Sequence, residues 1–69
     1  MRTVIIAQSD DGPAAFEKET GDLILDVNRV VMHIEAGRRV EATLHFNHYS
    51  KYSRQSVLEQ VLVEFPEQA

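Results

Sequence analysis

Residues 40–47, VEATLHFN, decide the fold that this chain is expected to adopt, because they carry its clearest secondary-structure pattern. Apolar and polar side chains alternate along the stretch, which is the period-two pattern of a strand with one buried face. The apolar members are Val40, Ala42, Leu44 and Phe46. The sequence therefore predicts a β-strand whose even-numbered residues face the core.

The preceding segment, residues 22–36 (DLILDVNRVVMHIEA), is compatible with two structures. As a helix it places its apolar residues on one narrow arc, and Gly37 would end it in a left-handed conformation. As a strand it alternates up to Val27 and then changes parity near Asn28, which requires a bulge or bend. Its β-branched residues and the strand that follows favour the strand, and the helix remains the alternative.

A turn through residues 36–38 would join these two strands in a hairpin and set their register. On one face this register pairs apolar residues with one another, and on the other, wetter face it pairs polar residues. The apolar pairs are Ile34 with Val40, Met32 with Ala42 and Val30 with Leu44; the wetter pairs are His33 with Glu41 and Arg29 with His45.

The N-terminal part begins with a short apolar, β-branched run over residues 3–8, which predicts a first strand. The turn-forming residues SDDGP at 9–13 end it. Two structures are compatible with the residues that follow. One is a hairpin that turns at Thr20 and Gly21; the other is a helix from Asp11 to Val27, with Asp11 as its cap and Pro13 in its first turn.

The C-terminal part carries the spacing of an amphipathic helix, with a capping box formed by Ser56 and Glu59 and with Pro66 as the stop. The apolar stripe consists of Val57, Leu58, Val61, Leu62 and Phe65. A strand over residues 61–65 is the alternative, because valine is a mediocre helix former.

Together these patterns predict one small domain, residues 1–69, of the α+β class. It would consist of an antiparallel β-meander of three to four strands packed by one C-terminal amphipathic helix, with an additional N-terminal helix as the alternative for residues 11–27. A core of this size contributes only ~3–5 kcal/mol of stability unless something reinforces it. Because the chain has no cysteine, disulfides and thiolate zinc sites are excluded. A homodimer is therefore expected.

Charge is unevenly distributed along the chain, which has a net charge of −4. Residues 1–28 hold six acids against two bases, whereas residues 29–55 hold five bases against two acids. The N-terminus has no apolar run long enough for a signal peptide, and no stretch of about 18 apolar residues could span a membrane. The sequence predicts a cytoplasmic protein, or one in the host cytoplasm if it is phage-encoded, without a membrane partner.

Residues 45–54, HFNHYSKYSR, hold the most chemically active side chains, yet they do not form a metal or catalytic pattern. His45 and His48 are three residues apart, which places them on opposite faces of a strand, and no carboxylate adjoins them. Ser50 and Ser53 lie near His48, but without the strained turn of a nucleophile. We expect no enzyme activity, no metal and no cofactor.

The same stretch is better suited to binding, because tyrosine and arginine are enriched at the centres of protein interfaces. The expected partner-binding residues are His48, Tyr49, Lys51, Tyr52 and Arg54, together with Arg29 and His45. They predict a small adaptor or inhibitor of a larger protein, of the kind that phages and plasmids carry as accessory genes. The alternative is a nucleic-acid-binding regulator in which the rings stack on bases and the basic groups meet phosphates.

Overall fold

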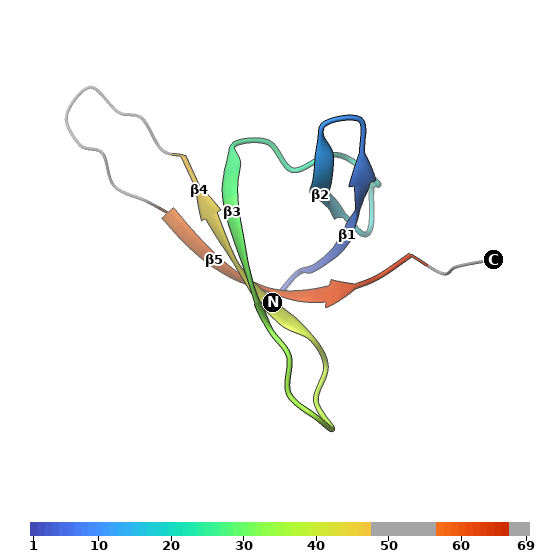
Figure 1. The fold of residues 1–69 in the computed structure, drawn as a ribbon, viewed down its shortest axis with the longest axis vertical. Coiled ribbons are helices and arrows are strands. Elements are labelled where there is room, and N and C mark those ends of the chain that lie inside the picture. Colours follow the sequence, from blue (N-terminus) through green and yellow to red (C-terminus); the bar gives the residue numbers. More distant parts are fainter. Residues whose placement is uncertain (48–56, 67–69) are drawn as a thin grey trace.

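Five strands form one curled, mixed sheet in the computed structural model, which describes residues 1–47 and 57–66. The strands are β1 (Thr3–Ser9), β2 (Gly12–Glu17), β3 (Val27–His33), β4 (Glu41–Phe46) and β5 (Val57–Glu64). Their order across the sheet is β2-β1-β5-β4-β3, and only β1 and β5 pair in parallel. The sheet curls into a half-barrel with β2 and β3 at its two edges (Figure 1).

The predicted α+β class is wrong, because the described residues form an all-β fold without a helix. The segment predicted as the C-terminal helix is β5, which lies between β1 and β4 and pairs with both. Within it, Val61 and Val63 are buried on one face while Gln60 is exposed. Pairing on both sides satisfies the backbone groups of a β-branched segment that has only moderate helix propensity.

The N-terminal helix that was the alternative for residues 11–27 is also wrong, because residues 12–17 form β2 against β1. The other reading of this region, a hairpin that turns at Thr20 and Gly21, is confirmed. Phe16 forms an antiparallel bridge with Leu23, and the N–H of Gly21 donates to the carbonyl of Glu17 at 2.8 Å. Gly21 has a positive φ of 76°, a conformation that glycine adopts without strain.

The hairpin predicted around residues 40–47 is confirmed in its strands and register. Cross-strand partners in β3 and β4 include Val30 with Leu44, Met32 with Ala42, His33 with Glu41 and Arg29 with His45. The register shifts between Val27 and Arg29, which places the predicted bulge at Asn28. The strand predicted over residues 22–36 is too long, because β3 spans only Val27–His33, and the predicted pair of Ile34 with Val40 is wrong because the ladder ends at His33.

The core lies on the concave face of the half-barrel, where alternate residues of the five strands meet. Leu44, Val4 and Val61 are the largest fully buried side chains, and Ala15, Ala42 and Val63 complete the buried apolar set among the described residues. Partly buried side chains surround this set: Ile6, Ile24, Val27, Val30, Met32, Val40 and Phe46. The core is therefore small and rests on a single layer of sheet.

Asp26 joins the connection from β2 to β3 in a left-handed conformation, with a φ of 65°. Its carbonyl accepts a hydrogen bond from the N–H of Asn47 at 2.8 Å, which holds the backbone in place. A residue with a Cβ atom is strained in this region, whereas glycine is not. We therefore expect Asp26→Gly to raise the free energy of unfolding by ~0.5–1 kcal/mol in urea titrations. Asp26→Ala, the control, should lower it; equal effects of the two substitutions would contradict the strain.

Candidate functional site

Two of the residues predicted to bind a partner lie within the described structure. Arg29 of β3 and His45 of β4 are cross-strand partners on the convex face, opposite the core. Arg29 is exposed and His45 is half-buried. The other predicted contacts, His48, Tyr49, Lys51, Tyr52 and Arg54, lie outside the described residues. The structure thus brings together one pair of the predicted set.

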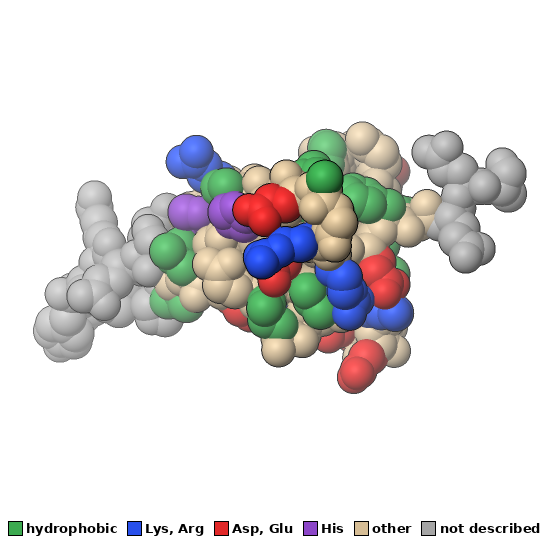
Figure 2. Space-filling view, turned by 90° about the horizontal axis from the view of Figure 1, so that it is seen from below, with side chains coloured by type: hydrophobic (Ala, Val, Ile, Leu, Met, Phe, Trp, Pro, Cys, Tyr) green, Lys and Arg blue, Asp and Glu red, His purple; other side chains and the backbone are tan. Residues whose placement is uncertain are grey.

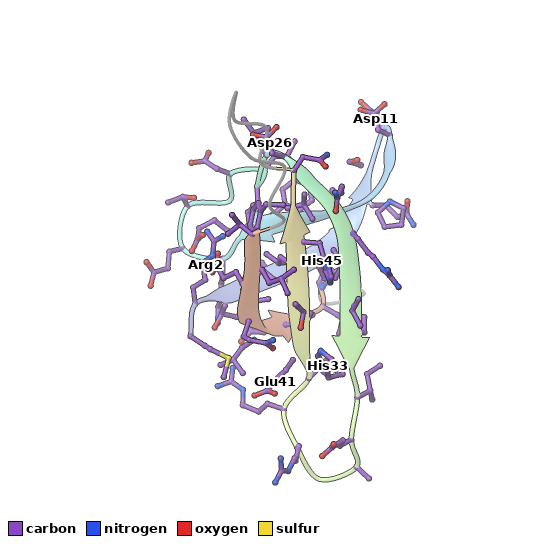
Figure 3. The ribbon with its side chains drawn as sticks, turned by 90° about the vertical axis from the view of Figure 1, so that its left-hand side faces the viewer. Arg2, Asp11, Asp26, His33, Glu41 and His45 are labelled. Carbon is purple, nitrogen blue, oxygen red and sulfur yellow. The ribbon has the colours of Figure 1, made fainter. Side chains whose placement is uncertain are left out.

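The convex face of β3 and β4 presents a polar strip around this pair. His33 and Thr43 share a hydrogen bond of 2.9 Å between Nε2 and Oγ1, and Glu41 lies opposite His33 (Figure 3). In the space-filling view, histidine side chains lie next to acidic and basic ones (Figure 2). Among residues 1–47 and 57–66, no group of three or more histidines and carboxylates is arranged to hold a metal ion.

A charged cluster lies at the start of β1, where Arg2 contacts two carboxylates. Its Nε and Nη2 donate to the two oxygens of Glu59 at 2.6 and 2.8 Å, and its Nη1 donates to Glu17 at 2.7 Å. The hydrogen bond with Glu59 is the main reason why the pKa of Arg2 is raised above its ordinary value. Since both carboxylates are engaged by Arg2, the cluster ties β1, β2 and β5 together.

A cleft of about 650 Å³ lies on the concave side, between the two edges of the half-barrel. One wall comes from β1, β2 and the connection to β3, and includes Ile6, Ala15, Leu23 and Ile24. The other wall is β3, with Val27, Val30 and Met32. Asp11 and Asp26 also line the cleft, and Arg29, although it lies on the convex face of the edge strand β3, contributes atoms to the lining. Its volume and apolar lining are typical of a binding site.

Backbone groups of β3 point outward beside this cleft. The N–H of Val63 donates to the carbonyl of Val40 at 2.9 Å, so the even-numbered residues of β4 direct their backbone groups to β5. The odd-numbered residues of β4 then bond to β3, where their partners are also odd-numbered. The N–H and C=O groups of Val30 and Met32 therefore point away from β4.

We call these outward groups of Val30 and Met32 the β3 edge. Within the part of the chain that the structure describes, β3 is the last strand on its side of the sheet, and no strand pairs with the β3 edge. The opposite edge differs, because the N–H of Ile24 donates to the carbonyl of Ala15 at 2.9 Å and so partly covers β2. An open strand next to an apolar cleft can accept a further strand.

Sequence reasoning missed both the cleft and the β3 edge. The alternation of Val30 and Met32 was visible, but the position of β3 at the end of the sheet depends on the order of all five strands.

The residues that the structure describes include no helix long and apolar enough to cross a membrane. Comparisons of the chain with protein-family models, with curated proteins and with solved structures found no match.

Proposed function

We propose that this protein is a non-enzymatic protein-binding module, an adaptor or inhibitor of a larger protein, that holds an extended segment of its partner along the β3 edge. The observation that supports the proposal is the row of outward N–H and C=O groups at Val30 and Met32 beside the apolar cleft. In strand addition, such groups provide the main-chain hydrogen bonds, and adjoining pockets select alternate side chains.

The side chains around the cleft fit this mode of binding. Leu25 lines the cleft and is 69% exposed, so a bound segment would remove apolar surface from water. Asp11 and Asp26 add two negative charges to the same cleft and Arg29 adds one positive charge, so the charged lining remains acidic by one and favours a segment that carries a basic residue. The place of action that we propose is the cytoplasm, or the host cytoplasm if the chain is phage-encoded.

The test is a capture experiment from an extract of the native host with the wild-type protein and with Val30→Pro. Proline lacks the outward N–H at this position, and its ring obstructs an incoming strand, while the bonds from β3 to β4 remain. We expect the variant to capture about tenfold less partner, or less still. The lost hydrogen bond and the clash together should cost more than about 1.4 kcal/mol of binding free energy, which corresponds to a factor of ten in affinity.

The matched control is Gln60→Ala, which changes an exposed side chain of β5 on the convex face and should capture as well as wild type. Circular dichroism verifies that both variants are folded. Equal capture by Val30→Pro would contradict the proposal. If the captured species is instead nucleic acid, with an affinity that falls log-linearly with salt, the rival regulator that uses residues 48–54 is favoured.

A further inference from the structure

We infer that in the free protein the β3 edge is occupied by β3 of a second copy, in an antiparallel pairing about a two-fold axis at Met32. This inference rests on the proposed function, since it requires that the β3 edge binds by strand addition. A two-fold axis makes such an interface isologous, so that every contact occurs twice. The two sheets would join into one continuous sheet.

The strand is self-complementary in this register. Met32 lies opposite Met32 of the second copy, and Val30 lies opposite its Ile34. The outward N–H and C=O groups of Met32 in one copy therefore face those of Met32 in the other and can form hydrogen bonds. Ile34 is 71% exposed and follows directly on β3, two residues after Met32. The pairing therefore covers an apolar side chain that the single chain leaves in water.

Charge selects this register over its neighbours. With the axis at Met32, Arg29 faces Glu35 of the second copy, and Glu35 would exchange its exposed intrachain ion pair with Arg38 (3.6 Å) for one between the copies. Moving the axis to Val31 would place Arg29 against His33, and moving it to Val30 would place Arg29 against Val31. Neither alternative pairs opposite charges.

The surroundings of the strand show the same complementarity. The chain before β3 is acidic, with Asp22 and Asp26, whereas the turn after β3 is basic, with Arg38 and Arg39. Antiparallel pairing brings the start of β3 in one chain next to the end of β3 in the other. The acidic connection of each copy thereby meets the basic turn of its neighbour.

The small core is a further reason to expect this partner. Among the described residues the buried apolar set contains one leucine, and the remaining members are valine and alanine. A domain below about 70–80 residues usually needs disulfides, a metal or oligomerisation in addition to its core. The chain contains no cysteine, and a second copy at the β3 edge would cover Leu25 and the cleft.

The dimer and the complex with a larger protein exclude each other, because both use the N–H and C=O groups of Val30 and Met32. The dimer is then the resting form, and a target segment must displace the second copy. Dimerisation also prevents the open strand β3 from pairing with unrelated chains.

Single cysteine substitutions test the register, since the natural chain has no thiol. In Met32→Cys, two residues opposite each other in a hydrogen-bonded pair have Cα atoms about 5.5 Å apart, within the range of a disulfide. We expect this variant to form a covalent dimer under mild oxidation at micromolar concentration. In the matched control Val30→Cys, the two thiols are offset by four residues, about 13 Å, and should not be linked.

Charge reversal tests the same pairing without touching the core. Arg29→Glu and Glu35→Arg should each weaken the dimer by about tenfold in sedimentation equilibrium, and the double variant should restore it. Both side chains are exposed, so folding should be unaffected. The cross-linked Met32→Cys dimer should also fail to capture the larger partner until it is reduced.

The outcomes separate this inference from the proposed function. A wild-type protein that is monomeric at all concentrations, with Met32→Cys unlinked, overturns the dimer, while capture sensitive to Val30→Pro still supports strand addition. Linking through Val30→Cys in place of Met32→Cys overturns the register. Equal capture by wild type and Val30→Pro overturns the proposed function even if a dimer exists.

Discussion

Replacing Leu44 with alanine is expected to lower the free energy of unfolding by ~3–5 kcal/mol. Leu44 is fully buried and is the largest buried side chain among the described residues, and its strand partners are packed on both sides. The loss combines the transfer of the removed methyl and methylene groups with the cavity that they leave. Because a domain of this size has only about that much stability, the variant should be largely unfolded at 25 °C.

Leu58→Ala is the matched control for this prediction, because it makes the same chemical change in the neighbouring strand β5 at a position that is 56% exposed. It should cost less than ~1 kcal/mol. Far-ultraviolet circular dichroism during urea titration measures both variants. A similar loss for the two substitutions would mean that Leu44 does not occupy the centre of the core.

Val31→Pro is expected to lower the free energy of unfolding by ~3 kcal/mol, whereas Val30→Pro, one residue away, should cost ~1 kcal/mol. The N–H of Val31 points to β4, where Thr43 is its partner, so proline removes a ladder hydrogen bond and leaves a buried carbonyl without its donor. The N–H of Val30 points to the β3 edge and makes no bond within the sheet. The difference in unfolding free energy between the two proline variants thus shows which N–H group points to β4 and which points to the β3 edge.

The measurement is urea unfolding of both proline variants in an Arg29→Glu background, at protein concentrations where sedimentation shows a monomer, so that dissociation of a dimer does not contribute. Amide hydrogen exchange provides a second readout: in this background the N–H of Val31 should be protected and those of Val30 and Met32 should exchange faster. Equal costs for the two prolines, or protection at Val30, would contradict the assignment of the β3 edge.

The β3 edge has features that are unusual for a strand left in water. Natural edge strands commonly carry proline or lysine, or are very short, which prevents unwanted pairing. β3 has seven residues, with Val27, Val30, Val31 and Met32 among them and without proline or lysine. Its bulge at Asn28 affects only its first residues. The strand is thus suited to accept a partner along residues 29–33.

The part of the fold that could be predicted from the sequence is the part formed by neighbouring residues. The strand at residues 40–47, the register of its hairpin with β3 and the bulge at Asn28 all follow from period-two alternation and one short turn. The same register correctly predicted that Arg29 and His45 are adjacent. Each of these features depends on residues within about twenty positions of one another, where local patterns are informative.

What the sequence by itself determined is therefore the strand near the N-terminus, one hairpin and the side chains on its two faces; the tertiary structure decided how the strands are ordered. The apolar stripe of residues 57–65 has the spacing of a helix, and pairing with β1 and β4 selects the strand against that pattern. The parallel contact of β1 with β5 joins opposite ends of the chain, which no local pattern records. Because β1 pairs with β5 and not with β3, β3 has β4 as its only neighbouring strand among the described residues and its other edge is open. Local periodicity specifies which face of a strand is buried, but only long-range pairing specifies which strand has no neighbour.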